Sequence, residues 1–187
     1  MKGYELPVSV SLGGKEYPIR SDYRAVLCVL RGMSDPDLDG EGRAILLLKG
    51  MYPGWKQIPP DHIREAIDRA NSFIDCGQVP QPGTPKPRTI DWEQDARLIV
   101  SAVNGVAHTE IRALEYLHWW TFFSYFMEIG ESLFSNVLHI RQKKASGKKL
   151  EKWEQDFYKN NAQIIDIKRK LSAAEQAERE SIERWLK

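Results

Sequence analysis

The acidic stretch from Asp35 to Gly40 has the residue types of a calcium-binding loop. Carboxylates stand at its first, third and fifth positions and glycine at its sixth, as in the opening of a 12-residue calcium loop. The twelfth position, where a bidentate glutamate closes the coordination shell, is Leu46, and the second position is Pro36. We therefore predict an exposed acidic loop rather than a metal site.

The cysteines and histidines do not have the spacing of a nucleophilic or metal site. Cys28 and Cys76 are expected to be buried free thiols in helices, and an apolar setting disfavours the reactive thiolate. The histidines stand far apart, without the paired spacing of zinc ligands: His62, His108, His118 and His139. We predict no catalytic residues, no cofactor and no metal, and hence a protein that is not an enzyme.

Asp91, Glu93 and Asp95 bring carboxylates to the expected start of a helix. The positive end of the helix dipole stabilises acidic side chains there. Asp91 also has Gln94 three residues later, which is capping-box spacing. A general acid/base pair would further need burial in a pocket, which these residues do not indicate.

A local basic run surrounds Trp153 and consists of Lys143, Lys144, Lys148, Lys149 and Lys152. Acidic residues in the same turns are expected to cancel much of its field, namely Glu151, Glu154 and Asp156. The whole chain has 27 Lys and Arg against 26 Asp and Glu, a formal net charge of +1. We therefore expect protein partners, with no nucleic acid and no membrane.

The chain predicts a mainly α fold, with a small N-terminal β-hairpin followed by a multi-helix bundle with a long C-terminal helix. Residues 8–12 and 15–19 alternate around Gly13-Gly14, which is the hairpin pattern. Helices are expected after Ser21-Asp22, over about 41–51 and between Pro60 and Gly77.

Four prolines within residues 79–89 predict an extended linker: Pro80, Pro82, Pro85 and Pro87. The hairpin and first helices then form an N-terminal subdomain, residues 1–78. Residues 90–187 form a helical C-terminal subdomain with a long charged terminal helix. Because no proline or glycine follows Lys149, one or two long helices are expected to run almost to Lys187.

From Thr109 to Ile129 the sequence predicts one helix that is apolar nearly all round. It carries too many charged residues for a membrane span, so we interpret it as buried. Trp119 and Trp120 point about 100° apart on a helix. With Phe123 they serve a core or contact another chain, and both alternatives stay open.

Further apolar side chains follow helical spacing near the C-terminus, and this stripe is interrupted before it resumes close to the chain end. They are Ile164, Ile167 and Leu171, and then Trp185. With Trp119, Trp120 and Phe123, we predict that these side chains bind a partner.

Three stretches resemble, in order and spacing, the gene-product-fifteen family of long-tailed bacteriophages. They are Leu6-Pro7 with Gly14–Ile19 and Asp22–Arg24, then Asp91–Ala96, and then Glu115–Phe122. Arg141 and Phe157-Tyr158 fit the closing segment of the family, and the likeness covers about Leu6 to Asp166. Within these motifs, structural roles are expected for Asp91, Gln94, Asp95 and His118.

The resemblance implies a non-catalytic tail assembly chaperone. Such a protein binds the tape measure protein and/or tail tube subunits during tail assembly. It acts in the host bacterial cytoplasm and is absent from the mature virion. Two alternatives stay open: a structural tail component or connector, and a host-interaction or nucleic-acid-binding regulator that rests on the lysine run. The tail beyond about Lys168 exceeds the family pattern, so it is a client-binding helix, a self-association helix or a solvated extension.

Overall fold

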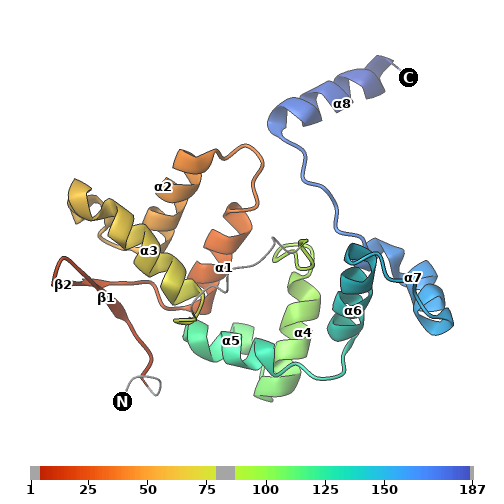
Figure 1. Ribbon diagram of the computed structural model, residues 1–187, viewed down its shortest axis with the longest axis horizontal. Coiled ribbons are helices and arrows are strands. Elements are labelled where there is room, and N and C mark those ends of the chain that lie inside the picture. The colour runs from red at the N-terminus through yellow and green to blue at the C-terminus, as the bar shows by residue number, and fades with distance from the viewer. Residues whose placement is uncertain (1–4, 79–86, 186–187) are drawn as a thin grey trace.

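A computed structural model describes residues 5–78 and 87–185, and within these ranges the chain is mainly α-helical, as predicted. Two strands open the fold, β1 (Ser9–Leu12) and β2 (Lys15–Pro18). Eight α-helices follow in the described residues: α1 (Tyr23–Gly32), α2 (Gly40–Met51), α3 (Ile63–Ile74), α4 (Ala96–Ala107), α5 (Trp119–Met127), α6 (Leu133–Ala145), α7 (Lys152–Ile165) and α8 (Ala173–Trp185). Figure 1 shows α1 to α3 near the hairpin, α5 below α1, the helices α4, α6 and α7 towards the opposite side, and α8 standing apart.

The hairpin forms where the sequence predicts it. β1 and β2 pair antiparallel with Val10 opposite Tyr17, so these side chains and Leu12 share the face that packs on the core. The turn residues Gly13 and Gly14 have φ angles of 54° and 80°, a conformation that glycine adopts without steric cost. The two-residue turn therefore fixes the register that points this face inward.

The first two α-helices begin at carboxylate caps. Asp22 Oδ1 accepts a hydrogen bond from Arg24 N–H at 2.9 Å, and Asp39 Oδ1 accepts one from Gly42 N–H at 2.7 Å. These bonds satisfy N–H groups that have no partner within the helix. The cap at Asp22 is as predicted, and the acidic loop supplies the second cap.

One hydrophobic core joins the two sides of the predicted linker. It contains Val26 and Phe73 from the first part of the chain and Val103 and Phe122 from the second, each at most 3% exposed. A smaller cluster joins α6 to α7 through Val137, Ile140 and Ile165. Most of the predicted linker, residues 79–86, lies outside the described residues. The predicted subdomains 1–78 and 90–187 thus share a core.

The predicted helix over Thr109–Ile129 is wrong in its first half. The chain there forms a 3-10 turn, Ile111–Ala113, and an extended stretch before α5. The stretch pairs with the start of α1, where Tyr23 N–H donates to Leu117 O at 2.9 Å. These long-range hydrogen bonds satisfy backbone groups that would bond within the segment if it were a helix. Within the described ranges, no helix is long and apolar enough to cross a membrane.

The charged C-terminal region forms two helices, α7 and α8, which is one of the two arrangements that the sequence predicts. Residues 166–172, here called the strap, run without helical structure between α7 and α8. Ile167 and Leu171 therefore lie outside any helix, and the predicted stripe with Ile164 is not a helix face. The last two carbonyls of α7 accept hydrogen bonds from Arg141 of α6, which ends the helix at this point.

Gly50 and Gly105 provide a matched test of helix packing. A Cβ at Gly50 in α2 would lie 2.2 Å from Val29 Cγ2 of α1, whereas one at Gly105 in α4 would meet no atom within 4 Å. We expect Gly50→Ala to destabilise the protein by about 1–3 kcal/mol through overpacking. We expect Gly105→Ala to stabilise it by up to about 1 kcal/mol through helix propensity. Urea denaturation measures both changes, and equal midpoints would contradict the close α1–α2 packing.

Candidate functional site

His118 fixes an N-terminal junction, where the segment before α5 meets the hairpin and α1. The residue is 3% exposed. Its Nδ1 accepts a hydrogen bond from Trp120 N–H at 3.0 Å and caps α5, while Nε2 donates to Pro7 O at 2.9 Å. Because a backbone N–H only donates and a carbonyl only accepts, the ring carries its proton on Nε2. Both nitrogens of His118 are therefore used by the fold.

The tryptophan pair closes the end of α3. Trp119 Nε1 donates to Ile74 O at 2.8 Å, and Trp120 Nε1 donates to Phe73 O at 2.9 Å. These bonds satisfy carbonyls that the helix end leaves without intrahelical donors. Trp119 is 1% exposed and Phe123 packs against it with ring centroids 5.6 Å apart. Trp119 therefore belongs to the core, while Trp120 and Phe123 are half-buried and pack against it.

Arg141 of α6 fixes a C-terminal junction and is 5% exposed. Its Nη1 and Nη2 form a bidentate ion pair with Asp95, at 2.6 and 2.8 Å. The guanidinium also donates to the carbonyl oxygens of Thr89 at 2.9 Å, Ile164 at 2.8 Å and Ile165 at 2.6 Å. All five N–H groups of the side chain are used, so the buried charge is fully compensated.

The turn before α4 is built on reciprocal carboxylate bonds. Asp91 Oδ1 accepts from Glu93 N–H and Gln94 N–H, both at 2.9 Å, and Asp95 Oδ2 accepts from Asp91 N–H at 2.9 Å. Burial opposes ionisation of Asp91, but these N–H groups and the Arg88 guanidinium hold its pKa below the usual value. Asp91 thus makes the capping half of the predicted box, whereas the reciprocal bond to Asp91 N–H comes from Asp95 and not from Gln94.

Gln94 binds the strap instead. Its Nε2 donates to Asp166 O at 2.9 Å, and its Oε1 accepts from Lys168 N–H at 3.0 Å. The amide side chain thus offers one donor and one acceptor to the strap backbone, much as a neighbouring strand does. Gln94 therefore links the Asp91–Asp95 turn to the chain beyond α7.

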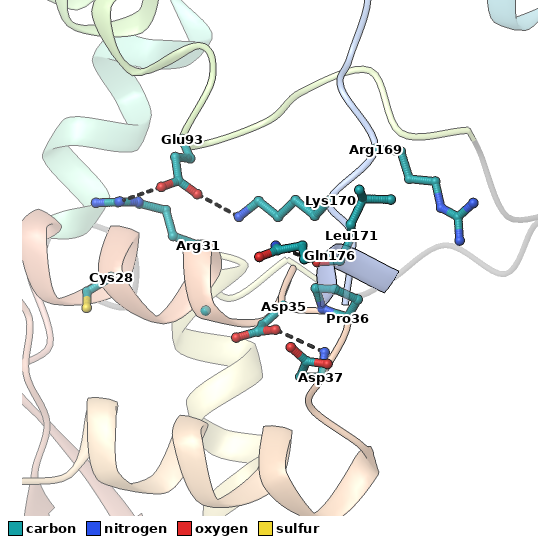
Figure 2. Close-up of a pocket in the computed structure, with 11 residues that line it drawn as sticks. Cys28, Arg31, Asp35, Pro36, Asp37, Glu93, Arg169, Lys170, Leu171 and Gln176 are labelled. Atoms are coloured by element: carbon teal, nitrogen blue, oxygen red, sulfur yellow. Dashed lines mark hydrogen bonds and ion pairs between the residues drawn. The ribbon is translucent and has the colours of Figure 1, made fainter. Parts of the chain in front are cut away.

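A cavity of about 730 Å³ lies between α1, the acidic loop and the strap, and several charged side chains line it. Figure 2 shows Glu93 between Arg31 and Lys170, which it contacts at 3.0 and 2.6 Å. The hydrogen bonds from Lys170 and Arg31 lower the pKa of Glu93. Asp37 accepts from Ala173 N–H at 3.0 Å. Exposed pairs of this kind contribute at most about 1 kcal/mol each, so polar surface contacts hold the strap.

The acidic loop directs its carboxylates to backbone groups. Asp35 accepts from Asp37 N–H at 3.0 Å, Asp37 accepts from the start of α8, and Asp39 caps α2. In residues 5–78 and 87–185, no three His, Cys, Asp or Glu side chains form a group that could hold a metal ion. The calcium-like spacing thus serves loop and helix geometry.

The two thiols differ from their predicted setting. Cys28 lies in α1 but is exposed, and it lines the cavity of Figure 2. Cys76 follows the end of α3 with a φ of 54° and is half-buried. Burial, together with the charge of Asp75, raises the pKa of the Cys76 thiol to about 11, which disfavours the thiolate that nucleophilic chemistry needs.

Glu154 of α7 is fully buried and connects to α6. It accepts hydrogen bonds from Lys143 Nζ at 2.5 Å, His139 Nε2 at 2.7 Å and Glu151 N–H at 2.6 Å. The bond from Lys143 outweighs burial and, with the other two, lowers the pKa of Glu154 to about 2. Glu154 thus pairs with Lys143 of the predicted basic run, while Glu151 and Asp156 are exposed beside the remaining lysines.

A groove of about 430 Å³, here called the α4 groove, lies between α4 and the segment that leads into α6, and both apolar and polar side chains line it, Glu131 and Ser132 among them. Its α4 side carries small residues at helical spacing, Ser101, Ala102 and Gly105, flanked by Leu98 and Val106. Across the groove stand Ile129, Leu133 and Phe134, of which Leu133 is 47% exposed. The small side chains leave room for another helix to approach α4 closely.

The side chains predicted to bind a partner do not form one surface. Trp119 is buried, Trp120 and Phe123 pack on the core, Ile164 packs on the α6–α7 cluster, Ile167 and Leu171 lie in the strap, and Trp185 on α8 is 88% exposed. The prediction missed the α4 groove, although the recurrence of Ser, Ala and Gly on α4 was a signal for it. It also missed the Asp95–Arg141 pair, which joins residues far apart in sequence.

These features define a small, mainly α-helical protein whose sequence motifs build two buried polar junctions. The family model described as Bacteriophage Gp15 protein matches residues 4–167, and the chain belongs to this family. It is therefore a bacteriophage protein. No curated protein and no solved structure matches the chain. The end of the strap and α8 lie beyond the residues that match the family.

The Asp95–Arg141 pair can be tested by a double-mutant cycle. Arg141→Met leaves the Asp95 carboxylate buried without a counter-ion, so we expect the free energy of unfolding to fall by about 3–5 kcal/mol. Asp95→Asn leaves the guanidinium similarly uncompensated. The double variant should lose less than the sum of the single variants, by about 1 kcal/mol or more. Urea denaturation of the four proteins measures this coupling, and strictly additive losses would show that the pair is not coupled.

Glu154 predicts a pH dependence of stability. Its pKa is about 2 in the folded protein against an ordinary value of 4.5. A lowered pKa stabilises the fold above the unfolded value, and this contribution is lost as the pH falls from about 4.5 towards 2. Glutamine does not ionise, so the Glu154→Gln variant should not show this part of the acid-induced loss of stability. Thermal denaturation of both proteins from about pH 6 to about pH 3, a range that includes the pKa of an unfolded glutamate, checks this prediction. An equal pH dependence of the two melting temperatures would refute the lowered pKa of Glu154.

Proposed function

We propose that this phage protein is a non-catalytic tail assembly chaperone that binds the tape measure protein, and/or tail tube subunits, during tail morphogenesis. It acts in the host bacterial cytoplasm and leaves before the virion is mature. Membership of the Gp15 family over residues 4–167 carries the proposal, together with the role that the resemblance implies for this family.

The use of the polar motif residues supports a non-catalytic role. His118 has both ring nitrogens bonded to backbone groups, and Arg141 has all its donors bonded to Asp95 and carbonyls. A catalytic acid, base or nucleophile has to exchange its partners with a substrate. Side chains that complete a folded junction are poorly suited to that exchange.

The α4 groove supplies a surface suited to a helical client. An amphipathic helix binds a groove through apolar residues spaced three and four apart along its own sequence. The apolar side chains of Leu98, Val106 and Leu133, which line the α4 groove, can contact such residues. Its volume of about 430 Å³ is small, so each contact is weak. Several copies along one long helical client would bind firmly in sum and still dissociate copy by copy.

Gly105 allows this surface to be blocked without disturbing the core. Gly105→Leu places a side chain in the α4 groove, while Gly105→Ala is the matched control, because a Cβ there meets no atom within 4 Å. We expect the tape measure protein of the same phage to co-purify with the tagged wild type and with Gly105→Ala. The yield with Gly105→Leu should fall about tenfold or more, as expected when a helix is displaced from its groove.

Two results would count against the proposal, and they differ in scope. Equal co-purification by Gly105→Leu and Gly105→Ala would remove the α4 groove as the binding surface. If neither the tape measure protein nor the tube subunits co-purify with the wild type, and all proteins are folded, the chaperone function itself is overturned.

A further inference from the structure

The face of α4 that lines the α4 groove has the residue spacing of a helix that could itself enter such a groove. Leu98, Ala102 and Val106 are four residues apart, and Ser101 and Gly105 lie beside them on the same face. A groove takes a helix whose apolar residues are spaced three and four apart. Because all five residues line the groove, this face is accessible, and α4 of a second copy of the chain is a helix of the required kind.

α4 and α6 run in opposite directions, which determines what lies at each end of the groove. The Asp95–Arg141 pair joins the start of α4 to the second half of α6. Figure 1 shows α6 running back beside α4, with which it is in contact. The segment that leads into α6, with Glu131, therefore lies at the end of α4 that holds Gly105. Arg97 lies at the opposite end, about 12 Å away along the helix axis at 1.5 Å per residue.

Arg97 gives the first end an unpaired positive charge. The side chain is exposed and makes no hydrogen bond or ion pair with another described residue. The acidic side chains closest to it in the sequence have other partners, since Glu93 is bonded to Arg31 and Lys170, and Asp95 to Arg141. The charge of Arg97 is therefore available to a second molecule.

Glu131 gives the other end an unpaired negative charge. It lines the groove, is exposed, and has no hydrogen-bond or ion-pair partner among residues 5–78 and 87–185. Glu128 is also exposed and unpaired there, and no lysine or arginine stands between Arg112 and Arg141 in the sequence. His108, exposed at the end of α4, is a further titratable side chain at this end. The groove thus has one basic and one acidic end.

A groove with ends of opposite charge is complementary to itself when two copies meet antiparallel. A two-fold axis through the middle of α4 brings Arg97 of each copy to the Glu131 end of the other, which gives two opposite-charge pairs. A parallel arrangement would bring like charges together. Ser101 and Gly105 lie near the axis, where their small side chains let the two helix backbones approach closely.

We propose that two copies of this protein associate through their α4 grooves, with the two α4 helices antiparallel and Arg97 of each copy paired with Glu131 of the other. A contact between two single helices is smaller than the standard interface of about 1,600 Å², so the dimer is weak and salt-dependent. The dimer occupies the surface assigned above to the client helix, so a client has to displace the second copy. This consequence rests on the proposed function, whereas the dimer itself does not.

Sedimentation velocity of the full chain over a concentration series tests the dimer, in buffer of about pH 8, where histidine side chains are uncharged. We expect the wild type to dimerise at low salt and to dissociate at about 0.5 M salt. Arg97→Glu and Glu131→Arg should each weaken the dimer about tenfold or more, because each brings like charges together at both ends. Arg64→Glu reverses an exposed charge on α3 and is the matched control, which should dimerise as the wild type does.

Exchanging the charges makes the test specific. The double variant Arg97→Glu/Glu131→Arg again has opposite charges at the two ends and should recover the affinity of the wild type. A mixture of the two single variants should form a heterodimer, because one variant has two acidic ends and the other two basic ends. Gly105→Leu should abolish the dimer by filling the groove, and circular dichroism confirms that each variant is folded.

The outcomes separate the dimer from the chaperone function. A wild type that stays monomeric at every concentration, or a dimer that Arg97→Glu, Glu131→Arg and Gly105→Leu leave unchanged, would overturn the dimer and leave the chaperone function standing. A dimer with the expected response to these variants, in a protein that co-purifies neither tape measure protein nor tube subunits, would support the dimer and overturn the function. A tape measure protein that binds without dissociating the dimer would overturn the displacement.

Discussion

The bidentate contact between Arg141 and Asp95 organises the second half of the molecule. One guanidinium joins α6 to the start of α4, to the chain before it and to the last two carbonyls of α7. A buried charge is costly unless every polar atom around it is satisfied, and here each donor has an acceptor. Alternative arrangements of these segments would leave a charge unpaired, so the contact selects one arrangement of α4, α6 and α7.

The same principle governs the first half, where His118 and Asp22 hold the chain before α5 against α1 and the hairpin. The motifs shared with the Gp15 family thus coincide with the junctions that determine how helices meet. The α4 groove and the exposed side chains of α8 lie outside these junctions. Under the proposed function, the contacts with a helical client are therefore separate from the junctions that hold the helices together.

Local patterns were sufficient to predict the hairpin, the cap at Asp22 and most helix positions, since these depend on neighbours in sequence. Long-range pairing was not predictable in the same way. The stretch before α5 is extended because it pairs with the start of α1, and the strap is extended because Gln94 binds its backbone. Trp119 was ambiguous from sequence for the same reason: its indole N–H finds its acceptor, Ile74 O, in α3.

The central claim is that this protein assists tail assembly and does not remain in the product. Quantitative mass spectrometry of purified, mature phage tails measures this most directly, with the tube subunit as internal reference. The chaperone account predicts that the protein is absent or present only in traces far below one copy per tail. Its presence in a fixed ratio to other tail proteins would contradict the account and identify a structural tail component.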